Sequence, residues 1–75
     1  MDGQVKVIAQ VIQERRMQDR QWGGADHDDT HTHIEWLNYI HYQQNRALNK
    51  DKRRDAMIKI AALAVAALES IDRKA

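Results

Sequence analysis

The segment AMIKIAALAVAAL, residues 56–68, is apolar on nearly every side when it is drawn as a helix. A helix that is apolar all round has to be covered all round. The chain has 75 residues and no proline, and its glycines stand only at positions 3, 23 and 24, so long stretches are free to be helical. The sequence therefore predicts an all-α protein in which this alanine-rich segment is buried.

Three helices account for nearly the whole chain, which is short enough to form one domain over residues 1–75. Their apolar residues recur at the three-and-four spacing of an amphipathic helix, apart from the last helix, which is apolar on most sides. We therefore expect a three-helix compact domain, with helices over residues 3–20, 33–48 and 52–73.

Local signals mark where these helices begin and end. Asp2 precedes the first helix as an N-cap, and Gly23 with Gly24 ends it. Thr32 followed three residues later by Glu35 is the pattern of a capping box, which predicts the start of the second helix at position 33. The connector between the first two helices is expected to be a polar loop.

Self-association is predicted from the size of the chain and from its last helix. A chain of 75 residues has little core of its own, and without cysteine it has neither disulfides nor a thiolate metal site. Two short partner helices cannot cover the last helix, whose alanines would let another helix approach closely. We predict a homo-oligomer with this helix in its interface, a two-fold dimer by default. The alternative is a monomer in which alanine supplies helix propensity only.

The net charge and the hydropathy of the chain argue against two classes of partner, nucleic acids and membranes. A formal net charge of +1 argues against general nucleic-acid binding, which needs a clear basic excess. The apolar run is interrupted by Lys59 and is shorter than the roughly 20 residues of a membrane-spanning helix. The first residues lack the pattern of a signal peptide. We therefore expect a cytoplasmic protein with no membrane partner.

The stretch QWGGADHDDTHTHIEW, residues 21–36, gathers histidines, aspartates and tryptophans. Its carboxylates and imidazoles are acceptable metal ligands, but they match no recognised ligand spacing. His-x-Asp and His-x-His alternate as an extended chain would, so neighbouring side chains point in different directions. We therefore expect no metal here; Asp28, Asp29 and Glu35 are the residues that a metal would have to use.

The same stretch offers a binding surface. Trp22 beside Gly23 and Gly24 places an aromatic plane next to permissive backbone, which can stack a base and let backbone amides approach a phosphate. The alternative is that Trp22 covers the open end of the core and the glycines only reverse the chain. For Trp36 the same choice arises between ligand contact and packing.

Arginines cluster at two places. Arg15, Arg16 and Arg20 lie near the end of the first helix, and Arg53 with Arg54 begins the last one. Guanidinium groups match the geometry of phosphate oxygens, so either cluster could clamp a nucleotide-like anion. The alternative is a solvated basic surface, with Arg20 complementing the helix dipole.

A resemblance to a known family follows from three ordered strings. ERRMQDRQWGGADHDDTHT, a second helix opening at EW, and IKIAALAVAALESIDRK together resemble small, mostly phage or prophage proteins similar to the MazG-like group, over most of residues 13–74. The resemblance implies an all-α oligomer related to nucleotide pyrophosphohydrolases. Such enzymes hold Mg with carboxylates on helices and cleave nucleoside triphosphates between the α and β phosphates.

The carboxylate motifs of that enzyme group are incomplete in this chain. The group places Glu-Glu-x-x-Glu on one helix and Glu-x-x-Asp on the next. Here Glu35 stands alone at the start of the second helix, and only Glu69 with Asp72 keeps the second spacing. The resemblance therefore implies a nucleotide-binding scaffold that lacks catalytic acids.

We predict a non-enzymatic, oligomeric binding protein for a small phosphate-bearing ligand, a nucleotide, that needs no cofactor. As a phage protein it would sequester a nucleotide signal used in host defence. The residues predicted to bind the ligand are Arg15, Arg16, Arg20, Trp22, Gly23, Gly24, His27, His31, Trp36, Arg53 and Arg54.

Two other functions remain open from the sequence. One is a Mg-dependent nucleotide pyrophosphohydrolase, the only case in which a metal cofactor is expected; its carboxylates would be Asp28, Asp29, Glu35, Glu69 and Asp72. The other is a phage inhibitor that binds a host protein directly, through a surface around Trp22, Trp36 and Tyr42.

Overall fold

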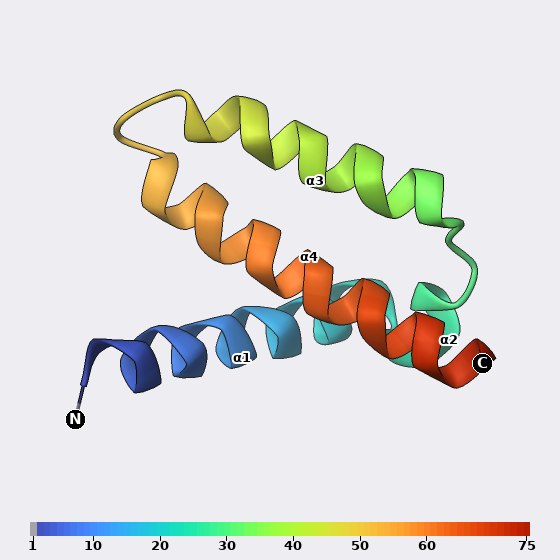
Figure 1. Ribbon diagram of the computed structural model, residues 1–75. Helices are drawn as coiled ribbons and strands as arrows, with labels where there is room; N and C mark the ends of the chain where they lie inside the picture. Colours follow the sequence, from blue (N-terminus) through green and yellow to red (C-terminus); the bar gives the residue numbers. More distant parts are fainter. Residues whose placement is uncertain (1) are drawn as a thin grey trace.

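The computed structural model describes residues 2–75, and all regular structure within them is helical. The all-α prediction is therefore confirmed. In Figure 1, two of the helices form an antiparallel hairpin, and the first helix lies along the opposite flank of the last one. The elements are α1 (Gly3–Trp22), α2 (Gly24–Asp28), α3 (His33–Ala47) and α4 (Arg53–Lys74).

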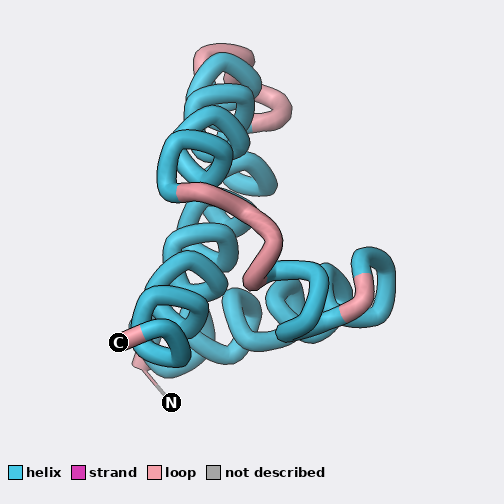
Figure 2. Tube along the Cα trace, turned by 90° about the vertical axis from the view of Figure 1, so that its right-hand side faces the viewer, coloured by secondary structure: helices cyan, strands magenta, loops and turns pink. Residues whose placement is uncertain are grey.

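The last helix, α4, is the central element. It packs against each of the other three helices, whereas the backbones of α1 and α3 make no contact with each other. Figure 2 shows the resulting two limbs, one formed by the α3–α4 hairpin and the other by α1 with α2. Side chains of α4 therefore form the floor between α1 and α3.

The helix ends follow the signals in the sequence. Asp2 caps α1, because its Oδ1 accepts a hydrogen bond from the backbone N–H of Val5 (3.0 Å). Thr32 and Glu35 form the predicted capping box, with bonds of 3.2 and 3.0 Å. Gly23 ends α1 with φ +103°, a left-handed conformation that side chains disfavour, and α1 therefore ends at Trp22, two residues beyond its predicted end.

Two predictions are wrong: that a polar loop joins the first two long helices, and that the chain has three helices. Residues 24–28 form the short helix α2. Glycine and aspartate have low helix propensity, so the local pattern favoured a loop. What holds α2 is tertiary: Asp28 bonds to Arg15 of α1, and the adjacent Asp29 bonds to Ser70 and Arg73 of α4.

The apolar core of residues 2–75 is small. Its buried apolar residues are Trp36, Ala56, Ala62 and Ala66, three of which are alanines. The radius of gyration is 12.7 Å, above the value of about 11 Å typical of a domain of this length. The chain is a compact helical unit, yet many large apolar side chains remain exposed.

Within residues 2–75, no helix has the length and apolarity needed to span a membrane.

Candidate functional site

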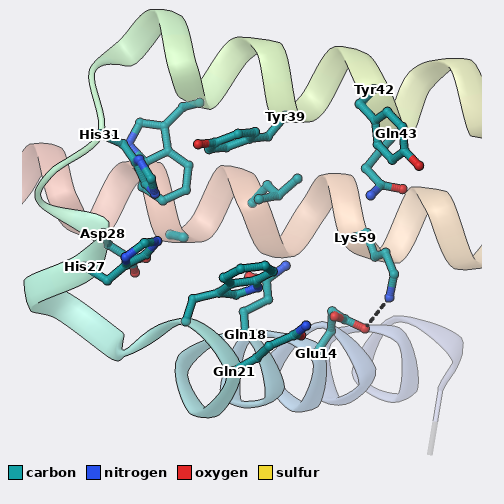
Figure 3. A pocket seen from close by; sticks show the side chains of 14 residues that line it. Glu14, Gln18, Gln21, His27, Asp28, His31, Tyr39, Tyr42, Gln43 and Lys59 are labelled. Atoms are coloured by element: carbon teal, nitrogen blue, oxygen red, sulfur yellow. Dashed lines mark hydrogen bonds and ion pairs between the residues drawn. The ribbon is translucent and has the colours of Figure 1, made fainter.

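A pocket lies between α1 and α3, above α4. Its volume is about 490 Å³, within the range of small-molecule sites. Figure 3 shows side chains from all four helices facing this opening. The lining residues are Glu14, Gln18, Gln21, Trp22, His27, Asp28, His31, Trp36, Tyr39, Tyr42, Gln43, Lys59, Leu63 and Ala66. The pocket therefore combines apolar and aromatic walls with a few polar groups.

Aromatic rings follow one another along one wall of the pocket. Trp22 stacks on His27 with a centroid distance of 6.2 Å and an interplanar angle of 21°. His31 lies edge-on to three rings, with centroids 4.8 Å from His27, 5.0 Å from Trp36 and 5.2 Å from Tyr39. Such edge-to-face pairs add stabilisation to that gained from burying the apolar area of the rings. His31 is therefore the centre of a connected aromatic wall.

Backbone bonds and one carboxylate hold His31 in place. Its N–H donates to the carbonyl of Asp28 (3.1 Å), and its own carbonyl accepts from Lys74 Nζ (3.4 Å). Its Nδ1 lies 3.8 Å from Glu35 Oε2, so the imidazole faces a carboxylate on the first turn of α3. The aromatic wall is thus tied to the ends of α2, α3 and α4.

Side-chain amides face the aromatic wall. Gln18 and Gln21 of α1 point into the opening in Figure 3, and within residues 2–75 neither side chain makes a hydrogen bond to another residue. Each amide offers donors and an acceptor. Gln43 of α3 accepts a bond from Arg46 Nη1 (2.6 Å). Gln18 and Gln21 therefore have the free polar atoms that would read the edge of a planar ligand.

The pocket holds little unpaired positive charge. Lys59 lines it and pairs with Glu14 of α1 (3.0 Å) and Asp55 of α4 (3.7 Å). Asp28 also lines it, and its Oδ2 accepts a bond from Arg15 Nη2 (2.7 Å). The charged groups at the pocket thus satisfy one another.

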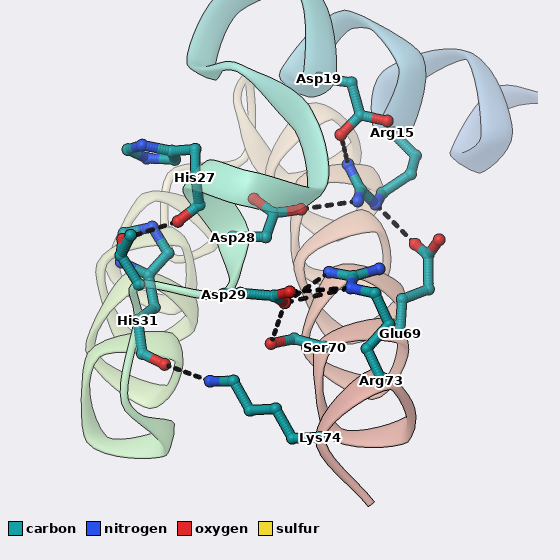
Figure 4. A network of polar contacts seen from close by, with 11 residues as sticks. Arg15, Asp19, His27, Asp28, Asp29, His31, Glu69, Ser70, Arg73 and Lys74 are labelled. Atoms are coloured by element: carbon teal, nitrogen blue, oxygen red, sulfur yellow. Dashed lines mark hydrogen bonds and ion pairs between the residues drawn. The ribbon is translucent and has the colours of Figure 1, made fainter.

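Beneath the pocket, one buried arginine joins three helices (Figure 4). Arg15 of α1 donates to Asp19 on its own helix, to Asp28 of α2 (2.7 Å) and to Glu69 of α4 (2.8 Å). Burial alone lowers the pKa of Arg15, but the hydrogen bonds to Asp19 and Glu69 outweigh it and raise that pKa above its ordinary value. Arg15 is therefore a structural cation with a saturated guanidinium group.

A second ion pair fixes the same C-terminal end of α2, through its C-cap residue Asp29. Asp29 accepts bonds from Arg73 Nη2 (2.8 Å) and Ser70 Oγ (2.9 Å), both on α4. The bond from Arg73, followed by that from Ser70, lowers the pKa of the Asp29 carboxyl. The C-terminal end of α2 is thus fastened to two partners, Arg15 of α1 through Asp28 and α4 through Asp29.

Four of the predicted binding residues come together at the pocket. Trp22, His27, His31 and Trp36 all line it, although they come from four different segments: α1, α2, the α2–α3 connection and α3. Trp36 is only 6% exposed, so it belongs to the core as well as to the pocket wall. Trp22 is 56% exposed and leaves much of its indole accessible.

The arginines and glycines predicted to bind lie elsewhere. Arg16 borders a second groove, between α1 and α4, and Arg20 is exposed in the last turn of α1. Arg53 donates to the carbonyl of Ala47 (3.0 Å), and Arg54 donates to Gln10. Gly23 and Gly24 make the turn between α1 and α2, both with positive φ, and do not line the pocket.

Each carboxylate that a metal would need already binds a different group of the protein. Asp28 binds Arg15, and Asp29 binds Arg73. Glu35 caps α3, and the bond from the Thr32 backbone lowers its pKa. Within residues 2–75, no three histidine or acidic side chains are grouped as metal ligands. For the enzyme alternative, Glu69 is likewise bound to Arg15, so these carboxylates do not converge.

Gln18, Gln21 and Lys59 line the pocket but were not predicted as site residues. The glutamines carry no local signal, because an amide on a helix surface is ordinary. Lys59 did carry one: it is the only charged residue in the apolar run 56–68. A lone lysine in such a run has to reach a carboxylate or an opening, and Lys59 reaches both.

The buried arginine leads to a prediction about stability. Arg15→Met leaves the buried carboxylate of Asp28 without its partner, so we expect the free energy of unfolding to fall by about 3 kcal/mol or more. The control is Arg16→Met, at an exposed neighbour, with a change below about 0.5 kcal/mol. Urea unfolding followed by circular dichroism measures both; equal losses would show that Arg15 does not hold the helices together.

The Asp29 pair leads to a prediction about pH. Because the folded-state pKa of Asp29 is lowered, its contribution to stability is present above the ordinary aspartate value of 3.8 and is lost as pH falls through the lower folded value. Asp29→Asn removes this charge but keeps an acceptor for Ser70. We measure the urea concentration at the midpoint of unfolding between about pH 6 and about pH 3. This midpoint should fall less in Asp29→Asn than in the native protein. Asp51→Asn, in the exposed α3–α4 turn, should decline as the native protein does.

Comparison of the chain with protein-family models, with curated proteins and with solved structures finds no match. The resemblance to the MazG-like group therefore stays a prediction.

Proposed function

We propose that this chain is a non-enzymatic binding protein whose pocket takes the base of a nucleotide. The observation that carries the proposal is the pairing of an aromatic wall with unbonded side-chain amides, around a volume of about 490 Å³. Aromatic planes stack on bases, and amides offer donors and acceptors to a base edge. The four predicted binding residues at the pocket, Trp22, His27, His31 and Trp36, belong to that wall.

Trp22 is the residue best suited to stack on the ligand. It is 56% exposed at the mouth of the pocket, while its stacking partner His27 limits the orientations of the indole. Trp36 is buried and shapes the wall. Gln18 and Gln21 lie on α1 as well, four residues and one residue before Trp22, and both line the pocket. A planar ring held at Trp22 would thus have amide groups available at its edge.

The charges favour recognition through the base more than through the phosphates. Among residues 2–75, Lys59 is the one lysine or arginine that lines the pocket, and it already pairs with two carboxylates. Arg15 is saturated by Asp19, Asp28 and Glu69. We therefore propose that the phosphates of the nucleotide remain at the mouth, in contact with solvent.

The engaged carboxylates support binding without catalysis. Asp28, Asp29 and Glu69 each bind an arginine, so the charge needed to hold Mg is already neutralised. A homo-oligomer that sequesters a nucleotide signal of the host, as the resemblance to phage proteins implies, would need such binding alone. The small apolar core supports the self-association.

The first test measures binding by calorimetry against nucleosides, nucleotides and cyclic nucleotides. We expect at least one to bind more tightly than millimolar, and Trp22→Ala to weaken it about tenfold or more, because base stacking on an aromatic is lost. Met17→Ala is the control, since Met17 is 52% exposed on the same helix and does not line the pocket. Binding no tighter than millimolar across the panel would overturn the proposal.

The second test varies only the phosphates. Because Lys59 is paired, a nucleoside and its mono- and triphosphate should differ in affinity by less than about tenfold. Lys59→Met should then leave nucleoside binding unchanged within that range. A triphosphate that binds about 100-fold more tightly than its nucleoside would show that phosphate contacts dominate.

Direct inhibition of a host protein remains the second candidate. Trp22 and Tyr42 are 56% and 64% exposed, and large exposed aromatics suit a protein interface. Trp36, the third residue predicted for that surface, is buried and would need a rearrangement to take part. Copurification with one host protein, together with no nucleotide binding, would favour this function.

A further inference from the structure

The side of α4 that faces away from the pocket carries an unpartnered apolar stripe. Its side chains follow one another at alternating spacings of four and three residues, which places them along one side of a helix. Met57, Leu68 and Ile71 are 54%, 60% and 55% exposed, and the alanines between them are half-buried. We call this set the outer stripe; it consists of Met57, Ala61, Ala64, Leu68 and Ile71.

The outer stripe continues onto α1. A second groove of about 290 Å³ lies between the two helices, with Val11 and Ile12 of α1 on one side and Val65 of α4 on the other. Ile8 and Ile12, one turn apart on α1, are 51% and 46% exposed. The same groove is also lined by Arg15, Arg16, Asp19 and Glu69, so the apolar side chains between α1 and α4 lie beside charged ones.

The chain as a whole exposes more surface than a monomer of its size is expected to expose. The accessible surface of the chain is 5590 Å², about 800 Å² more than expected for a monomer of 8.8 kDa. A standard protein interface buries about 800 Å² on each partner. The monomer thus exposes an excess of the size that one copy would lose on pairing.

Charges at the two ends of the stripe indicate how the copies are oriented. Arg54 stands at the start of α4 and Asp72 at its end, about five turns apart and therefore on the same side of the helix. Within residues 2–75, the Asp72 side chain makes no hydrogen bond or ion pair, and Arg54 bonds only to the amide of Gln10. Two such helices that run antiparallel can place Arg54 of each beside Asp72 of the other, which favours that orientation.

We propose that the chain forms a two-fold dimer in which α4 of a second copy lies antiparallel along the outer stripe. The register that places Met57 against Leu68 of the second copy also places Ala61 against Ala64. It brings Arg54 next to Asp72 of the other chain, once at each end. The central alanines allow the two helices to approach closely, and the same surface serves both copies, as two-fold symmetry requires.

This arrangement determines where the binding sites lie. The pocket opens between α1 and α3, and the outer stripe is on the opposite side of α4. The dimer therefore carries two pockets that face outward, and neither is covered by the second copy. The inference rests on the proposed self-association and is independent of ligand binding, so the two can fail separately.

The test is sedimentation equilibrium of the full chain and two matched variants. Leu68→Glu places a charge in the outer stripe, and Leu37→Glu places the same charge on α3, where the leucine is 58% exposed. We expect the native chain and Leu37→Glu to be dimers. The dissociation constant of the Leu68→Glu dimer should be about 100-fold higher than that of the native dimer. If Leu37→Glu dissociates and Leu68→Glu does not, the interface lies on α3 and the proposal is wrong.

Charge reversal tests the orientation without adding a charge to the apolar stripe. Arg54→Asp and Asp72→Arg should each weaken the dimer about tenfold, and the double variant should restore it. A double variant as weak as the sum of the single ones would exclude the antiparallel register. A native chain that stays monomeric at high concentration would overturn the self-association itself. In each variant, nucleotide binding is measured as well, and we expect it to be unchanged.

Discussion

The arrangement of the helices depends on the guanidinium group of Arg15. It is buried on α1 and must keep its charge, so it requires acceptors from its surroundings. The carboxylates of Asp28 and Glu69 supply them from α2 and α4. The bond to Asp28 holds α2 against α1, and α2 in turn carries His27 into the wall of the pocket. The candidate site therefore exists because a buried charge is neutralised beneath it.

The two sides of α4 explain why this helix is apolar all round. On one side, Ala62 and Ala66 are buried where the other helices meet it, and Ala66 also borders the pocket. On the other side, Leu68 and Ile71 remain exposed. Alanine is useful on both sides for the same reason, because a short side chain lets a neighbouring backbone approach closely. One helix thus serves as the floor of the pocket and, in our proposal, as the centre of a dimer.

Neighbours in the sequence have different roles in the fold. Arg15 and Arg16 are adjacent, but they project about 100° apart on α1, so one is buried among carboxylates and the other is exposed. Their clustering suggested a phosphate clamp. In the structure, Arg15 is occupied with Asp28 and Glu69, and Arg16 borders the second groove. A basic cluster in a short chain therefore need not be a binding site, because a small core has few other ways to join its helices.

The sequence by itself determined the all-α class and the helix ends at Asp2, Gly23 and Thr32, since caps and left-handed turns depend on neighbouring residues. It also pointed to Trp22, His27, His31 and Trp36. Only the tertiary structure decided that α2 is a helix and that Gln18 and Lys59 face the aromatic wall. The physical reason is that these features depend on contacts between residues far apart in the chain, such as Lys59 with Glu14 and Asp29 with Arg73, and no local pattern records such contacts.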